Sequence, residues 1–106
     1  MIIKNSPEKA PKVDAAVDGR IMYSEDRLEA ILLRLAPGET MPVHKNPFDV
    51  LFIGIVGKAS MVAEDRRLDI SPGESIFITA EEKRGWQNTS DSPCRIMAVK
   101  ILSRHT

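Results

Sequence analysis

Apolar residues in this chain come in short runs between turn residues, a pattern that predicts strands. The strongest run is 50–56, Val-Leu-Phe-Ile-Gly-Ile-Val, in which β-branched and aromatic residues predominate. Gly54 interrupts that run, and a glycine inside a strand marks a bulge or a close approach by another backbone segment. We therefore expect a strand at 50–56 with a local irregularity at Gly54.

The other apolar runs predict further short strands at 20–23, 28–36, 59–63, 68–70, 75–79, 84–88 and 95–102, and an extended segment at 41–46. Taken alone, 28–36 is ambiguous, because its leucines and alanines favour helix. Pro37 and Gly38 end it, and everything that follows is strand-like, so we interpret it as a strand. Eight or more short strands, with turn signals about every 8 to 12 residues and no amphipathic helix, predict an all-β sandwich or barrel.

The 106 residues fit a single domain with an arm in front of it. Residues 1–18 contain Pro7, Pro11 and scattered charges, so we expect an extended arm there. Within the arm, Ile2 and Ile3 are candidates for adding a strand to a sheet edge. Residues 19–106 are then expected to form one barrel domain.

Composition narrows the choice of partners and compartment. Fifteen basic and fifteen acidic residues leave no net charge, which argues against nucleic acid or an anionic membrane as a partner. Cys94 is the only cysteine, so we expect no intramolecular disulfide and a buried or half-buried, unreactive thiol. No signal peptide and no run of roughly 18 apolar residues is present, so we expect a soluble protein of the cytoplasm.

One short pattern occurs twice in the chain. Pro37-Gly38-Glu39 returns 35 residues later as Pro72-Gly73-Glu74, and each copy precedes an apolar strand and a polar segment. Three shared residues are a weak repeat by themselves. Their positions are nevertheless those that the two halves of a jelly roll would give them.

This paired layout resembles the two motifs of the cupin superfamily. The first cupin motif is a glycine, two histidines one residue apart, a glutamate and a second glycine. Gly38, His44 and Gly57 match it, while Asn46 stands at the second histidine and Val50 at the glutamate.

The second cupin motif contains a glycine, a proline, a glycine, a histidine and an asparagine. Gly73 and Asn88 match it, while Thr79, Glu81 and Arg84 stand at the proline, the inner glycine and the histidine. The resemblance covers about residues 28–102. It implies a cupin-type double-stranded β-helix, which is a jelly-roll barrel, and a homodimer, because small cupins commonly pair through edge strands or N-terminal arms.

The resemblance also bears on metal binding. In metal-dependent cupins the two histidines, the glutamate and the later histidine hold the ion at the barrel centre, and here only His44 is kept. One imidazole cannot hold a transition metal, which takes three or four protein ligands in a catalytic site. Asp49 is one residue before the ligand position at Val50, and strand alternation turns it to the other face. We therefore expect no tightly bound transition metal and leave the cofactor open.

Two candidate site residues have both a functional and a structural interpretation. His44 is a candidate general base or hydrogen-bonding group in a pocket, or a side chain satisfied by a backbone carbonyl. Arg84, if it keeps the inward direction of the histidine it replaces, places a guanidinium in an apolar cavity. A buried charge of this kind requires a carboxylate partner, for which Glu81, Glu82 and Asp49 are candidates, or an anionic ligand.

Four further residues are candidates for contacts with a ligand. Trp86 either stacks on a ligand or packs in the barrel core. Asn46 offers an amide, and Phe48 and Val50 are expected to line the mouth of the cavity. For Asn88 we expect a role in a turn.

Three functions are compatible with these residues. The sequence favours a cupin that binds a small polar or anionic molecule through Arg84, His44 and Asn46 without a full metal site. The first alternative is an enzyme, either an isomerase or lyase that uses His44 for acid–base chemistry or a weak metalloenzyme. The second is a structural or partner-binding domain with a filled barrel. A filled cavity would favour the last of these, and a bound metal with unexpected ligands would favour the enzyme.

Overall fold

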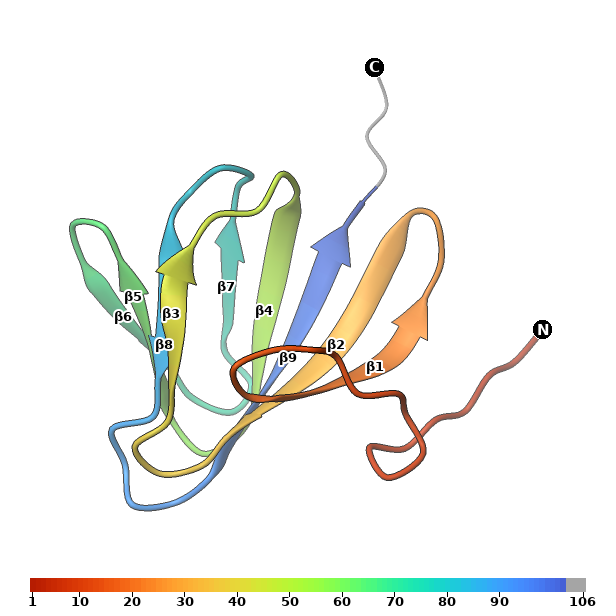
Figure 1. Cartoon of the computed structure of the whole chain (residues 1–106), viewed down its shortest axis with the longest axis horizontal. Helices are drawn as coiled ribbons and strands as arrows, with labels where there is room; N and C mark the ends of the chain where they lie inside the picture. The colour runs from red at the N-terminus through yellow and green to blue at the C-terminus, as the bar shows by residue number, and fades with distance from the viewer. Residues whose placement is uncertain (103–106) are drawn as a thin grey trace.

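The computed structural model describes residues 1–102 of the chain, and nine strands lie within that range (Figure 1). They are β1 (Asp18–Ser24), β2 (Leu28–Leu35), β3 (Thr40–His44), β4 (Asp49–Val56), β5 (Ala59–Ala63), β6 (Arg67–Ile70), β7 (Ser75–Ile78), β8 (Arg84–Gln87) and β9 (Cys94–Ile101). The described part of the chain has no helix, which confirms the all-β prediction. Residues 1–102 therefore contain no helix that could cross a membrane.

The strands form two antiparallel sheets that face each other as a jelly roll. One sheet has five strands in the order β1-β2-β9-β4-β7, and the other has four in the order β3-β8-β5-β6. The segment that was ambiguous by composition, Leu28–Leu35, lies inside the five-stranded sheet between β1 and β9. Pairing with both neighbours outweighs the helix propensity of its leucines.

The hydrophobic core lies between the two sheets. Strand residues alternate between the two faces of a sheet, so Phe52 on β4 and Ile96 and Ala98 on β9 face the core together. From the other sheet Trp86 on β8 meets them, and its indole packs edge-on against the ring of Phe52 with a centroid separation of 5.1 Å. Cys94 is buried as expected, and burial raises the pKa of its thiol, which keeps it in the unreactive protonated form.

The N-terminal arm packs against the barrel in its second half. Val13 donates its amide to Gly19, and Ile21 donates to the carbonyl of Pro11, so that residues 11–13 run beside the start of β1. The guanidinium of Arg20 donates to the carbonyl of Pro7 at 3.1 Å. Ile2 and Ile3 form no strand with the described residues and are exposed. The arm therefore adds to the barrel through residues 7–17 and not through its first residues.

Gly54 is both an irregularity and a point of close approach. The pairing of β4 with β9 shifts register between Gly54 and Val56. A side chain at Gly54 would collide with the backbone carbonyl of Ser71, because the turn at 71–74 folds against it and donates the amide of Gly73 to the carbonyl of Gly54. Both expectations for this glycine are confirmed.

We predict that Gly54→Ala destabilises the protein by roughly 1–3 kcal/mol, since the added methyl group must push a backbone segment aside. Urea unfolding followed by tryptophan fluorescence measures this. Lys58→Ala, an exposed position in the next turn, serves as the control and should change stability by less than about 0.5 kcal/mol. Equal stability of the two variants would contradict the close approach.

Candidate functional site

A cavity of about 170 Å³ lies between the two sheets. Most of its wall is apolar and comes from both sheets: Ile31, Leu33, Met41, Val50, Phe52, Trp86 and Ala98. The polar side chains that line it are Asp14, His44, Asn46, Arg84 and Lys100. The site thus combines an apolar interior with a few polar groups, which is the usual make-up of a small-molecule site.

Arg84 is the buried charge of this cavity. It begins β8, is only 2% exposed, and faces the same side of its strand as Trp86. Its one hydrogen bond to the described residues runs from Nη1 to the carbonyl of Glu82, and it is long, at 3.4 Å. Burial lowers the pKa of the guanidinium, and no neighbouring carboxylate raises it.

None of the three candidate carboxylates forms an ion pair with Arg84 in the described structure. Glu81 lies near Lys45, at 3.6 Å from its ammonium. Asp49 accepts a hydrogen bond from the amide of Ala80 at 2.8 Å. Within residues 1–102, no ion pair of any kind includes Arg84. The guanidinium is therefore available to a ligand.

His44 stands at the rim of the same cavity. It ends β3 and is paired in register with Arg84 across the β3–β8 ladder. The ring is exposed, and its Nδ1 lies 2.8 Å from the carbonyl of Pro42. Because a carbonyl only accepts, Nδ1–H is the donor, and Nε2 of the neutral ring keeps its lone pair. The backbone contact thus orients the imidazole and leaves one nitrogen able to accept a proton.

Trp86 packs in the core, one of the two roles considered for it, and it also lines the cavity. Stacking on a ligand stays a prediction. It is 1% exposed, and its indole Nε1–H is buried with no acceptor among the described residues. A buried donor without an acceptor costs about 1–3 kcal/mol. An acceptor on a ligand would relieve that cost if it reached the indole nitrogen.

The remaining predicted residues divide between wall and surroundings. Asn46 and Val50 line the cavity, and contact of the Asn46 amide with a ligand stays a prediction. Phe48 is not among the residues that line it, and its ring packs against the core. The ammonium of Lys100 lies over that ring, 5.2 Å from its centroid. Asn88 is buried in the turn after β8, where its amide donates to the carbonyls of Leu35 and Ser92.

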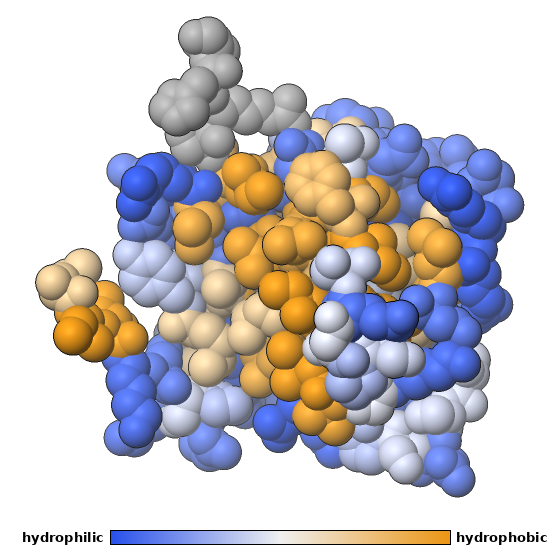
Figure 2. Space-filling model, turned by 180° about the vertical axis from the view of Figure 1, so that it is seen from behind, coloured by the Kyte–Doolittle hydropathy of each residue, from blue (hydrophilic) through white to orange (hydrophobic). Residues whose placement is uncertain are grey.

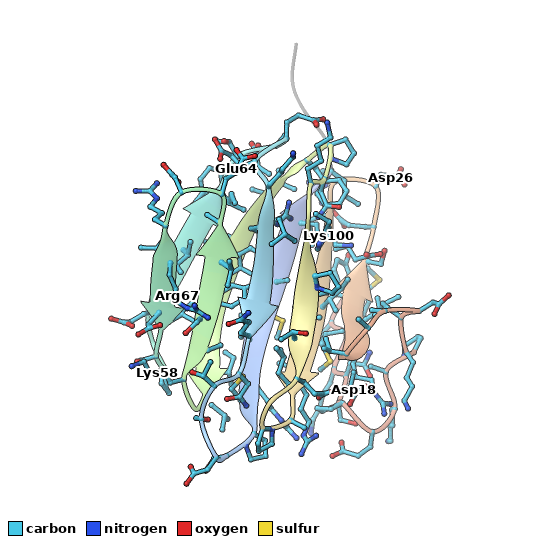
Figure 3. All side chains as sticks on the ribbon, turned by 60° about the vertical axis from the view of Figure 1, so that its left-hand side comes forward. Asp18, Asp26, Lys58, Glu64, Arg67 and Lys100 are labelled. Carbon is cyan, nitrogen blue, oxygen red and sulfur yellow. The ribbon has the colours of Figure 1, made fainter. Side chains whose placement is uncertain are left out.

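Two contributors to the cavity were missed from the sequence. Lys100 faces inward on β9, one alternation beyond Ala98, and its ammonium lies 3.6 Å from Glu29 on β2. Figure 3 shows Lys100 away from the labelled residues Lys58, Glu64 and Arg67, which lie near β5 and β6. The arm residues 13–15 close another side of the cavity. Strict alternation along β9 could have found Lys100, but no pattern in the arm indicates that it reaches the barrel.

The sequence of residues 31–100 matches the family model of the cupin domain, which is most of the chain. The chain belongs to the cupin superfamily. Solved structures agree with this cupin in fold. The polyketide cyclase RemF from Streptomyces resistomycificus superposes with a TM-score of 0.85 at 20% identity, over 100% of this chain and 83% of that one. KdgF from a Halomonas species superposes with a TM-score of 0.81 at 14% identity, over 97% of this chain and 96% of that one.

A third similar structure is a conserved-barrel cupin domain protein from Salinispora arenicola, with a TM-score of 0.81, 17% identity, and coverage of 95% of this chain and 88% of that one. No curated protein sequence matches this cupin. Identities this low establish the shared fold, and the chemistry has to come from this chain's own residues.

The four positions that hold the ion in metal-dependent cupins come together here, since His44, Asn46, Val50 and Arg84 all line the cavity. Their chemistry does not fit a metal. One imidazole, one amide, one apolar side chain and one guanidinium provide a single strong ligand and a repelling charge. Within residues 1–102, no group of three or more His, Cys, Asp and Glu side chains is placed to hold an ion.

We predict that the purified protein carries well under one equivalent of zinc, nickel, iron or manganese after dialysis. Elemental analysis by plasma mass spectrometry measures the content directly. A stoichiometric metal that resists dialysis and is lost in His44→Ala would contradict the interpretation of these four positions.

Proposed function

We propose that this cupin binds a small carboxylate with an apolar body inside the barrel, using Arg84 in place of a metal ion as the positive charge. The observation that carries the proposal is the burial of the Arg84 guanidinium in the cavity wall without an ion pair to residues 1–102. A buried cation of this kind is stabilised when a ligand brings the opposite charge. A guanidinium also matches a carboxylate in shape, because its N–H groups donate two parallel hydrogen bonds.

Hydrogen-bonding capacity favours an acceptor-rich ligand. Arg84 and the indole N–H of Trp86 are donors only, and both belong to the wall. Asn46 adds an amide that donates or accepts. A carboxylate has two acceptor oxygens and no donor, which complements this set.

Size limits the ligand's body. An apolar cavity of about 150 Å³ is large enough to hold a benzene molecule, and this cavity has about 170 Å³. The ligand is therefore a carboxylate with roughly four to seven carbon atoms. An open cavity of this size also disfavours a barrel filled for purely structural purposes. We place the protein in the cytoplasm, where a free thiol such as Cys94 stays reduced.

The first test is a thermal-shift titration with benzoate and isovalerate, with the uncharged benzamide and isovaleramide as matched controls. At 100 times its dissociation constant a ligand stabilises the fold by about 2.7 kcal/mol, which raises the melting temperature of a domain this size by roughly 10 °C or more. We expect the shift with the carboxylates and not with the amides. Equal shifts with both would show that charge is not recognised.

The second test is Arg84→Met. We expect the melting temperature of the free protein to stay or rise, because apolar volume replaces a buried charge, and the carboxylate shift to disappear. Arg66→Met, at an exposed turn position, is the control and should keep the shift. A loss of roughly 3 kcal/mol or more in Arg84→Met with an unchanged ligand profile would make Arg84 a structural residue and refute the proposal.

A second candidate function rests on His44. Its Nδ1–H donates to Pro42, which leaves Nε2 as a base at the rim of the cavity that contains Arg84. A carboxylate held by Arg84 would then present its body to that base. This arrangement is suited to removing a proton from an activated carbon, the first step of an isomerase or a lyase.

Deuterium exchange tests this candidate. The probe is 3-methyl-2-oxobutanoate, in which the ketone acidifies the C3 proton; the protein is incubated with it in D₂O, and loss of the C3 proton is followed by NMR. We expect exchange above the protein-free rate and a loss of about 100-fold or more in His44→Gln. Exchange that survives unchanged in His44→Gln would place the base elsewhere, and no exchange would leave a binding protein.

A further inference from the structure

Lys100 is the second cation of the cavity wall, and its place on β9 is unusual. Ile96 and Ala98 face the core, and strand alternation turns Lys100 to the same side. The same alternation turns Val99 and Ile101, both apolar, to the outside. Figure 2 shows an extended apolar surface on the molecule seen from behind. A sheet with one face in water normally carries its charges on that face, so the inward charge of Lys100 does not serve solubility.

Lys100 and Arg84 lie on opposite sheets at the same end of the barrel. At this end β9 finishes and β8 begins (Figure 1). Lys100 is paired in register with Val50 on β4. Val50 and Arg84 each come two residues before one ring of the aromatic pair that joins the two sheets. Because facing sheets lie only about 10 Å apart and both cations line one cavity, a single small ligand can reach both.

The ammonium of Lys100 is held in position while its donors stay available. The nearest carboxylate oxygen, on Glu29 of β2, is 3.6 Å away, which is too far for a normal hydrogen bond. The other oxygen of Glu29 accepts a hydrogen bond from the hydroxyl of Ser24 at 3.0 Å. The ring of Phe48 attracts the ammonium from below through a cation–π contact. Within residues 1–102 the ammonium donates no hydrogen bond, and it has three N–H groups.

The two cations differ in their charge balance. Within residues 1–102 Arg84 forms no ion pair, so a carboxylate on the ligand supplies the missing charge. Lys100 already has the charge of Glu29 beside it, and Asp14 places another negative charge on the wall of the cavity. These two carboxylates would repel a second negative group that approached Lys100. An uncharged oxygen accepts a hydrogen bond from the ammonium without that repulsion.

We propose that Lys100 selects ligands that carry a ketone oxygen in addition to the carboxylate, so that the ligand of this cavity is a short oxo acid. The inference rests on the proposed function, because it adds a second contact to a carboxylate held by Arg84. A ketone oxygen only accepts hydrogen bonds. It therefore complements a wall on which Arg84, Lys100 and the indole of Trp86 only donate, whereas a hydroxyl group also brings a proton that needs an acceptor.

Isothermal titration calorimetry of the full chain with matched carboxylates tests this inference. 3-Methyl-2-oxobutanoate and isovalerate share one carbon skeleton and differ only in the ketone. We expect the oxo acid to bind about tenfold or more tightly, because it adds a hydrogen bond to a charged group. The corresponding hydroxy acid, 2-hydroxy-3-methylbutanoate, should bind less tightly than the oxo acid. A hydroxy acid that binds more tightly than the oxo acid would overturn the inference.

Removal of the Glu29–Lys100 pair tests the assignment of this preference to Lys100. Glu29→Gln combined with Lys100→Met removes the ammonium and leaves the net charge unchanged. We expect this variant to bind the oxo acid and isovalerate with equal affinity. The control is Lys58→Met combined with Asp69→Asn, which removes another lysine–carboxylate pair, 3.1 Å apart, from β5–β6 and should keep the preference. Circular dichroism melting checks that both variants are folded, and the wild-type comparison needs no variant.

A dicarboxylate tests the charge balance at Lys100. Methylsuccinate is isovalerate with one methyl group replaced by a carboxylate. We expect it to bind wild type no more tightly than isovalerate, and to bind Glu29→Gln about tenfold or more tightly than wild type, because the ammonium then lacks its counter-charge. A wild-type protein that prefers methylsuccinate to the oxo acid would overturn the inference.

The failure of this inference and the failure of the proposed function give different results. Equal wild-type affinity for the oxo acid and isovalerate would overturn the inference and leave a carboxylate-binding cupin. A preference for the oxo acid that survives in the variant without the Glu29–Lys100 pair would overturn it too. Binding of neither compound would overturn the proposed function and the inference together.

Discussion

The contact between Phe52 and Trp86 is the point on which the site depends. The two rings join the five-stranded sheet to the four-stranded one, 5.1 Å apart and nearly perpendicular. Because Trp86 is held inward on a strand of only four residues, Arg84 two positions earlier must face inward too. Moving the guanidinium to water would require a shift of one residue in β8, which would expose the indole. The packing of Trp86 against Phe52 thus fixes the inward direction of Arg84.

Much of the fold follows from local pattern. Runs of β-branched and aromatic residues between Pro-Gly turns place the strands, and at most boundaries they do so within a residue or two. The inward direction of Arg84 also follows, since Trp86 is the one tryptophan of the chain and belongs in the core. The irregularity at Gly54 is also predictable, because a glycine inside a strand often marks a bulge or the close approach of another backbone segment.

Other parts of the site depend on contacts between distant segments, which no local pattern reports. Residues 13–15 belong to the segment that was expected to be an extended arm, and Val13 reaches the barrel because Gly19 has no side chain to keep it away. Arg84 has three acidic residues near it in sequence or in the fold, and only the tertiary structure reveals that none of them forms an ion pair with it within residues 1–102. The partner of a charge is a property of tertiary structure, since Glu81 lies near Lys45 and Asp49 accepts a hydrogen bond from the amide of Ala80.

A guanidinium in place of a metal ion changes which ligands the cavity can recognise and how their affinity depends on pH. A metal accepts any ligand atom with a free lone pair and needs deprotonated protein ligands, so its affinity depends on pH. The guanidinium instead favours a planar acceptor with two oxygens, to which it donates two parallel hydrogen bonds. Burial lowers the pKa of Arg84, but a guanidinium is so strongly basic that the group keeps its charge near neutral pH. In the proposed function the positive charge that selects an anion is therefore constant near neutral pH, and a pH dependence of binding would come from titration of the ligand.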